Sequence, residues 1–201
     1  MTGIEYRSLT DRDFPGVHRV ALESWRSAYR GLMDEERIEA TINDHYSAER
    51  LRQVLGKVTA GSRYFEVAVR DEQVLGFCTI VFTSLGAELS RLYILPEFFG
   101  TRIAWTLVQR AAQYLRSRGF HSCHSWVHRG NQRAIKIFLR GGARRVPDLD
   151  RDDSYYVEKA LTVRGSMTNA VKRVLRRVAR RLRGGRLTPA QSVTSDIRDD
   201  S

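Results

Sequence analysis

The chain has 201 residues, 42% of them hydrophobic and 9% aromatic, which is enough to bury one core of domain size and leave a tail. Its net charge of +11 is uneven, because residues 162–186 hold nine Lys and Arg and no acidic residue, so most of the basic character belongs to an appendage. The chain has no charged leader before an apolar run and no stretch of about eighteen apolar residues, which argues against secretion and membrane spanning and favours a cytoplasmic protein.

The N-terminal part predicts one strand followed by helices. Residues Ile4–Leu9 alternate between apolar and polar side chains, as a half-buried strand does. Thr10 or Asp11 then caps a helix that runs to about Tyr29. Residues 34–58 have helical composition and spacing and predict two further helical pieces.

Two β-rich segments follow, and a short turn joins them. Residues 64–70 and 73–82 are rich in aromatic and branched apolar side chains, and Asp71 and Glu72 separate them. A two-residue connection of this kind is typical of an antiparallel pair, so we predict a β-hairpin.

Residues 88–119 are the segment around which the chain is organised, and they predict a buried strand, a tight turn containing glycine and an amphipathic helix. Pro96 ends the strand because proline cannot donate to a sheet ladder. From Ile103 the apolar residues recur at helical spacing until Gly119. A helix that opens directly after a strand presents unpaired N–H groups and a positive dipole end, so this corner is predicted to bind a diphosphate.

The rest of the domain predicts a fifth strand over residues 121–128, a helix over residues 131–140 and a closing strand over residues 153–161. A polar loop with one proline precedes the closing strand. The order of strands and helices therefore predicts an α/β domain.

The fifth strand is unusually polar for a sheet. His124, Trp126 and His128 share one of its faces. Either histidine is a base or an acceptor-site group, or it is a histidine whose hydrogen bonds are satisfied within the fold. No carboxylate or thiolate stands at a useful ligand spacing, so no metal is expected. Cys78 and Cys123 show no CxxC spacing and are interpreted as small buried residues of a reducing compartment.

The last forty residues differ from the domain, residues 1–161. Within residues 162–186, a basic appendage, the segment 169–183 places its valines and leucines on one stripe among arginines, which predicts a cationic amphipathic helix. Such a helix lies in a lipid interface, binds nucleic-acid phosphates, docks on an acidic protein or packs on its own domain. The regular stripe without aromatic residues favours an anionic membrane surface or an acidic protein. Residues 187–201 are polar and predicted to be disordered.

Three stretches resemble the GNAT superfamily of N-acyltransferases. Residues 92–108, LYILPEFFGTRIAWTLV, are similar to its cofactor motif, in which an apolar strand, a proline and an acidic residue precede (Gln/Arg)-x-x-Gly-x-(Gly/Ala). Residues 131–138, NQRAIKIF, resemble its Asn-x-x-Ala-x-x-(Phe/Tyr)-Tyr segment, and residues 24–31, SWRSAYRG, resemble a common first-helix phrase. The resemblance covers about residues 3–161 and implies the GNAT fold, with a mixed, mostly antiparallel sheet of six to seven strands flanked by helices.

The resemblance also implies a donor: acetyl-CoA or another acyl-CoA, with an acyl carrier protein thioester as a variant. It places donor-binding groups at a phosphate loop, at a thioester cradle and on the second motif, namely Phe99, Gly100, Thr101, Arg102, Ile103 and Ala104, then Leu92, Tyr93 and Ile94, then Asn131 and Phe138.

Two residues of the phosphate loop depart from the family's pattern. Phe99 stands where the family has Gln or Arg, and Arg102 stands where it has Gly. A side chain at position 102 either blocks the approach of pyrophosphate or supplies a guanidinium to it. Because the helix end is preserved and arginine adds positive charge, we expect a phosphopantetheine-bearing donor to bind.

Acyl transfer to an amine needs a base for the ammonium proton, donors for the oxyanion and an acid for the departing thiolate. The resemblance implies Glu88 as the base, because carboxylates at this end of the central strand serve that role in related enzymes; the alternative is a surface glutamate. His124 is the second catalytic candidate. Phe138 or its neighbour Leu139 occupies the position of the family's usual tyrosine, so no hydroxyl reaches the sulfur from there.

Two functions remain open from the sequence. The first is an N-acyltransferase that moves an acyl group to a primary amine of a small molecule or peptide by direct attack in a ternary complex. The second is a catalytically decayed adaptor of the same shape, held at a membrane periphery or on an acidic partner by residues 169–183. Deleting residues 169–201 separates them, since an enzyme with a dispensable tail keeps its turnover.

Overall fold

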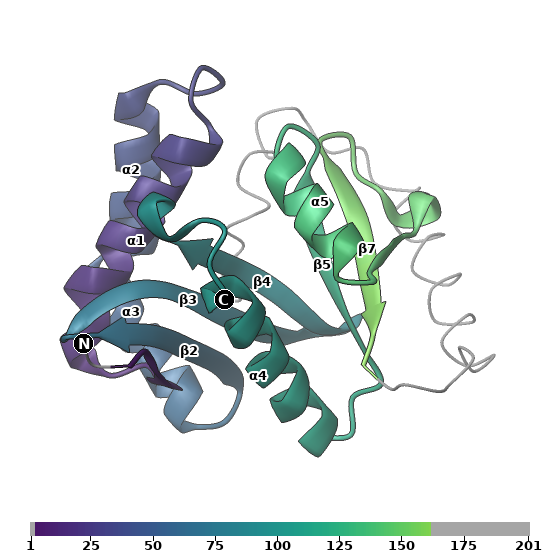
Figure 1. Ribbon diagram of the computed structural model, residues 1–201, viewed down its shortest axis with the longest axis horizontal. Coiled ribbons are helices and arrows are strands. Elements are labelled where there is room, and N and C mark those ends of the chain that lie inside the picture. The colour runs from purple at the N-terminus through teal and green to yellow at the C-terminus, as the bar shows by residue number, and fades with distance from the viewer. Residues whose placement is uncertain (1–2, 162–201) are drawn as a thin grey trace. The chain divides into compact units, whose positions relative to one another are not determined.

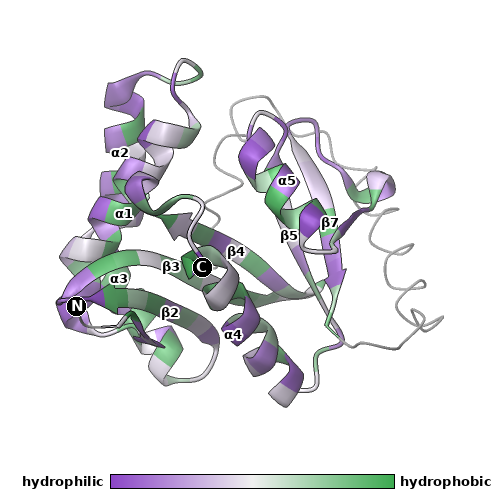
Figure 2. Ribbon diagram, in the orientation of Figure 1, coloured by the Kyte–Doolittle hydropathy of each residue, from purple (hydrophilic) through white to green (hydrophobic). Residues whose placement is uncertain are grey.

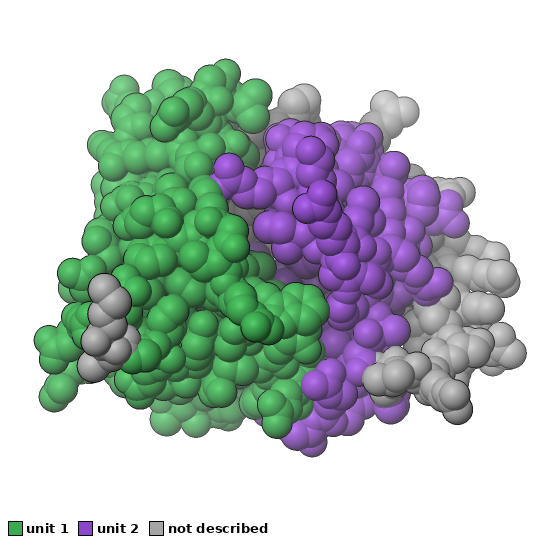
Figure 3. Space-filling view, in the orientation of Figure 1, with its two compact units in different colours: residues 1–81, 91–114 green, residues 82–90, 115–201 purple. Residues whose placement is uncertain are grey.

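The computed structural model describes residues 3–161, so the predicted basic helix and polar tail lie outside the described residues. Seven strands form one sheet in the order β1-β2-β3-β4-β5-β7-β6 (Figure 1). Within residues 3–161 there are two compact units, residues 3–81 with 91–114 and residues 82–90 with 115–161 (Figure 3), and strand β4 (Gly86–Ile94) contributes to both. The predicted α/β fold is confirmed.

The first unit contains an antiparallel sheet and four helices. Its strands are β1 (Glu5–Ser8), β2 (Arg63–Arg70), β3 (Gln73–Thr83) and the second half of β4, and its helices are α1 (Phe14–Ala28), α2 (Glu35–His45), α3 (Ala48–Thr59) and most of α4 (Ile103–Ser117). Within the described residues, no helix has both the length and the apolar content needed to cross a bilayer.

The predicted hairpin is confirmed, and its turn has the expected backbone. Asp71 and Glu72 have φ values of 50° and 63°, the left-handed region that a two-residue hairpin turn of this type requires. The turn carries β2 directly into β3, and the two strands pair from Arg63 opposite Val81 to Arg70 opposite Gln73. The hairpin therefore sets the register of the sheet in the first unit.

Side chains of β2 alternate between the two faces of the sheet and contact different helices. Phe65 stacks on Phe77 of β3 at 5.1 Å, and Phe77 lies 6.0 Å from Tyr46 at the end of α2. On the opposite face, Tyr64 stacks on Tyr114 of α4 at 4.6 Å. Figure 2 shows hydrophobic residues along β3 and β4, whereas α4 carries both hydrophobic and hydrophilic residues. Each face of the hairpin is thus covered by helices, as an amphipathic α/β layer requires.

The first helix begins later than the sequence predicts. A 3-10 turn over Asp11–Asp13 follows Thr10, and α1 starts at Phe14 with Pro15 in its first turn. Asp13, whose side chain is 4% exposed, accepts two hydrogen bonds from Arg7, at 2.7 and 2.9 Å, and two from the amide and hydroxyl of Thr10, both at 2.8 Å. This carboxylate ties β1 to the start of α1.

Replacing Asp13 by Asn is expected to destabilise the protein by about 2 kcal/mol at neutral pH, because hydrogen bonds to a charged group are lost. Burial alone raises the pKa of Asp13, but the hydrogen bonds from Arg7 and Thr10 outweigh burial and lower it below its usual range. A lowered folded-state pKa adds stability that is present above the unfolded value, about 3.9, and is lost as pH falls through the folded value. Urea unfolding at pH 7 and pH 3 measures this: the difference between wild type and Asp13→Asn should shrink at pH 3, and an unchanged difference contradicts the assignment.

The second unit contains the first half of β4 together with β5 (Ser122–His128), α5 (Gln132–Arg140), β6 (Arg144–Arg145) and β7 (Ser154–Ala160). Strand β5 pairs in parallel with β4 and antiparallel with β7, and β6 adds to the other edge of β7. The predicted strand, helix and closing strand are confirmed, whereas the two residues of β6 carry no strand signal in the sequence.

Both faces of β5 are covered. On one face, Trp126 packs with Leu149 and Tyr156. On the other face, Val127 packs with Ala143 and Val157. Residues 124–127 are buried, so the polar side chains of His124 and Ser125 lie inside the fold, whereas Ser122 and His128 at the strand ends are partly exposed.

Candidate active site

The loop between β4 and α4 is built by a 3-10 turn and one glycine. Pro96–Phe98 form the turn, and Gly100 follows with φ of 83°, a conformation that glycine adopts without steric cost. The Thr101 hydroxyl donates to the Phe98 carbonyl at 2.7 Å and accepts from the Ile103 amide at 3.4 Å. Gly100 thus reverses the chain, and Thr101 holds the first turn of α4.

Three amides at the start of α4 make no hydrogen bond to the described residues. They belong to Arg102, Ala104 and Trp105, and the first backbone bond of the helix runs from the Thr106 amide to the Arg102 carbonyl. The Arg102 side chain is exposed and forms no ion pair within residues 3–161, and Phe99 is 37% exposed. Within the described residues, free N–H groups therefore stand next to a guanidinium that has no ion-pair partner, a combination suited to an anion. Ile103 is buried and its amide is engaged by Thr101.

The end of β4, where the thioester cradle is predicted, is held by β3 and α1. A Cβ at Gly76 of β3 would lie 2.8 Å from the Tyr93 carbonyl oxygen, so only glycine allows this approach. The Ser24 hydroxyl donates to the Ile94 carbonyl at 3.0 Å. The Trp25 indole donates to the Tyr93 hydroxyl at 3.0 Å. The backbone over Leu92–Ile94 is therefore held by Gly76 of β3 and by two residues of the first-helix stretch 24–31.

In the second unit, the two predicted catalytic residues lie together. Glu88 and His124 are direct partners in the parallel ladder of β4 and β5, so both side chains project from the same face. Glu88 Oε2 lies 3.5 Å from His124 Nε2, and the Glu88 side chain is 18% exposed. Within the described residues, this ring nitrogen makes no hydrogen bond of good geometry although His124 is buried. A carboxylate that touches solvent beside a buried imidazole is a group able to accept and pass a proton.

The buried imidazole is oriented by an aromatic neighbour. The His124 ring stacks on Tyr156 of β7 with centroids 5.1 Å apart and planes 15° apart. Tyr156 is fully buried, and burial raises the pKa of its hydroxyl, so it remains protonated at neutral pH. In the antiparallel ladder His124 pairs with Glu158, and Tyr156 lies two residues before Glu158 on the same face of β7. The stacking of His124 on Tyr156 therefore depends on strand pairing and is not visible in the sequence.

Asn131 and Phe138, the two residues of the second motif that are predicted to contact the donor, stabilise the fold around α5. The Asn131 side chain accepts from the Ala134 amide at 3.0 Å and so caps α5. Phe138 packs on the cluster of Val127, Ala143 and Val157. Its neighbour Leu139 is exposed. Neither side chain carries a hydroxyl, so neither can donate a proton to sulfur.

Neither cysteine is prepared to act as a nucleophile. Cys78 is fully buried in β3. Burial raises the pKa of the Cys123 thiol to about 12. Because the thiolate is the reactive form, both thiols are chemically quiet at neutral pH.

A polar recess lies at the junction of α2 and α3 in the first unit. Its lining includes two carboxylates, Asp44 and Glu49, together with Arg50. Carboxylates at the rim of a recess attract cationic ligands. Within residues 3–161, no three His, Cys, Asp or Glu side chains come together as ligands for a metal ion.

Comparison with known proteins identifies relatives of this fold. The family described as Acetyltransferase (GNAT) family matches residues 19–142. The spermidine N(1)-acetyltransferase of Thermoplasma acidophilum is 32% identical over 157 residues, which span 78% of this chain and 96% of that protein. The crystal structure of PaiA N-acetyltransferase from Thermoplasma acidophilum in complex with coenzyme A matches with a TM-score of 0.75 at 29% identity, covering 79% of this chain and 99% of that one. A GNAT-family acetyltransferase from Staphylococcus aureus shares the fold, with a TM-score of 0.63 at 10% identity over 80% of this chain and all of that one.

Proposed function

Because the chain belongs to the GNAT family of acetyltransferases, we propose that it transfers the acetyl group of acetyl-CoA to a primary amine of a small polyamine by direct attack in a ternary complex. The observation that carries the proposal is the Glu88–His124 pair, with 3.5 Å between Oε2 and Nε2. The resemblance to a spermidine N(1)-acetyltransferase supports a polyamine as the acceptor.

Glu88 acts as the base. It accepts one proton from the substrate ammonium, directly or through a water, and the free amine then attacks the thioester carbonyl carbon. The C–N bond forms, the C–S bond breaks and the electron pair leaves with sulfur, while the attacking nitrogen loses its second proton to the departing CoA thiolate, directly or through water. His124 is the buried neighbour of this carboxylate, with 3.5 Å between Nε2 and Oε2, and acts as a positioning residue for Glu88.

The state of the two cysteines favours direct attack. With both thiols unreactive, no cysteine is available to carry an acetyl group as an enzyme intermediate.

The thiolate leaves without a proton from α5, because Phe138 and Leu139 stand at the usual tyrosine position. A thiolate of ordinary basicity, with a pKa near 8.5 in the free thiol, is a leaving group good enough for this step.

The start of α4 binds the donor's phosphates. The amides of Arg102, Ala104 and Trp105 provide the helix-end contacts, and the Arg102 guanidinium replaces the close approach that glycine permits in relatives. A carrier-protein donor presents one phosphodiester instead of a pyrophosphate, and an exposed arginine also suits that group, so both thioester donors belong in the test.

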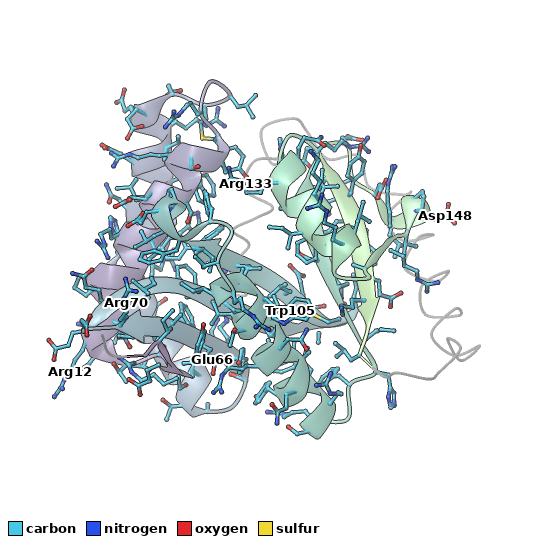
Figure 4. The ribbon with its side chains drawn as sticks, in the orientation of Figure 1. Arg12, Glu66, Arg70, Trp105, Arg133 and Asp148 are labelled. Atoms are coloured by element: carbon cyan, nitrogen blue, oxygen red, sulfur yellow. The ribbon has the colours of Figure 1, made fainter. Side chains whose placement is uncertain are left out.

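Replacing Arg102 by Gly is expected to raise the Kd of acetyl-CoA about tenfold, because a charge-assisted contact to phosphate is lost. Calorimetric titration of the full chain measures this, and Arg12→Gly, the same substitution at an exposed arginine outside the loop (Figure 4), is the matched control. Tighter binding by Arg102→Gly contradicts the assignment and makes Arg102 an obstruction.

The function itself is tested by following thiol release from acetyl-CoA with spermidine, and from an acyl carrier protein thioester with the same amine. Turnover with acetyl-CoA is the expected result. Absence of donor binding and turnover with both thioesters contradicts the proposed activity and leaves the adaptor interpretation. Deleting residues 169–201 should leave turnover on soluble amines unchanged.

A further inference from the structure

Trp105 is a large aromatic side chain left in solvent on the first turn of α4. Trp105 (labelled in Figure 4) is 50% exposed, whereas the other two tryptophans, Trp25 and Trp126, are 1% and 8% exposed. No ring stacking, cation–π contact or side-chain hydrogen bond joins Trp105 to the described residues. An exposed indole without such contacts is more typical of a binding surface than of a free surface.

The helix geometry places this indole beside the free amides. Arg102 directly precedes α4, and Trp105 lies in the first turn of the helix, three residues further on. Helical side chains lean toward the N-terminus of their helix. The indole of Trp105 therefore leans toward the end of α4 at which the unpaired amides and the Arg102 guanidinium are presented.

A flat aromatic surface next to a phosphate-binding helix end fits a nucleotide. We propose that Trp105 stacks on the adenine ring of CoA while the helix end binds the pyrophosphate; this inference rests on the proposed function. The ring face of a purine gains binding free energy from stacking on an indole without needing a hydrogen-bond partner. Adenosine is present in CoA and absent from the phosphopantetheine arm of a carrier protein, so Trp105 makes the site selective for CoA thioesters.

The proposal is tested by measuring Kd for CoA and for 4′-phosphopantetheine, which keeps a phosphate and lacks adenosine. Trp105→Ala should weaken CoA about tenfold and leave 4′-phosphopantetheine within about twofold. Trp105→Phe preserves a stacking face and should stay within about threefold of wild type for both. Because the other two tryptophans are buried, CoA should also quench the emission of wild type and not that of Trp105→Phe.

Each result has one meaning. Equal loss of both ligands in Trp105→Ala contradicts the proposal, because it indicates damage to the helix end rather than loss of a base contact. Unchanged CoA affinity in Trp105→Ala overturns it as well, and if carrier-protein binding falls instead, the indole is a protein contact. Failure of the wild type to bind CoA by calorimetry is a failure of the proposed function, and it is recognised before any variant is compared.

Discussion

Replacing Glu88 by Gln is expected to lower kcat by about 10²–10⁴ with spermidine as the acceptor. The amide keeps the size of the carboxylate but cannot take the ammonium proton, so the amine remains protonated and unreactive. The loss should appear in kcat, because Glu88 lies beside His124 in the second unit and not in the loop that we propose binds the donor. Steady-state thiol release at saturating acetyl-CoA gives kcat, and calorimetry gives the Kd of acetyl-CoA, which should change less than about threefold.

Glu72→Gln is the matched control for this variant. Glu72 is exposed in the hairpin turn of the first unit, and its substitution removes the same charge without touching the pair. His124→Gln should lower kcat less than Glu88→Gln, since the imidazole acts through the neighbouring carboxylate, and it should leave the Kd of acetyl-CoA unchanged. A Glu88→Gln enzyme with wild-type kcat rules out Glu88 as the base, and a wild-type kcat in His124→Gln assigns that histidine to packing alone.

Replacing Glu66 by Gln is expected to lower the free energy of unfolding by about 2 kcal/mol, which is about 4–8 °C in Tm for a domain of this size. Glu66 is buried in β2 (Figure 4), and its two oxygens accept from the Tyr64 hydroxyl and from Arg110 Nε of α4, both at 2.6 Å. Arg110 also donates to the Tyr6 carbonyl at 3.2 Å, so one carboxylate links α4 to β2 and, through Arg110, to β1. Thermal and urea unfolding measure the change.

The exposed Arg26–Glu35 pair supplies the control for Glu66. Glu35→Gln removes the same kind of ion pair where both side chains are in water, and it should cost under about 1 kcal/mol. Coupling between Glu66→Gln and Tyr64→Phe in a double-mutant cycle should be at least about 0.5 kcal/mol, since the two residues share a hydrogen bond. A Glu66→Gln protein as stable as Glu35→Gln shows that the buried carboxylate contributes no more than a surface one.

The sequence predicts a strand or helix correctly where its position depends on residues that are close together in the chain. The hairpin at Asp71 and Glu72 is of this kind, because its turn residues lie in the left-handed region and sit between two β-rich segments. The start of α1 is not of this kind. Asp13 contacts Arg7 on the preceding strand, and that interaction stabilises a 3-10 turn where the sequence predicts the first turn of the helix. The short β6 depends wholly on pairing with β7.

The site divides in the same way. The position of the loop around Gly100 follows from a motif that is continuous in sequence, whereas the contact between Glu88 and His124 depends on parallel pairing across two strands separated by a helix. The sequence predicts both residues as candidates, but only the strand pairing places them opposite each other. No sequence pattern points to Gly76 or Trp105, because Gly76 matters through a carbonyl on a neighbouring strand and Trp105 through its exposure.

The quiet thiols have a practical consequence for work on this enzyme. An aromatic disulfide reagent that captures each released CoA finds no competing sulfur on the folded domain, since Cys78 is enclosed and Cys123 stays protonated far above the working pH. CoA release can therefore be followed continuously by absorbance. In the absence of substrate, any absorbance that the reagent gives with the protein measures the fraction of molecules that have unfolded and exposed their cysteines.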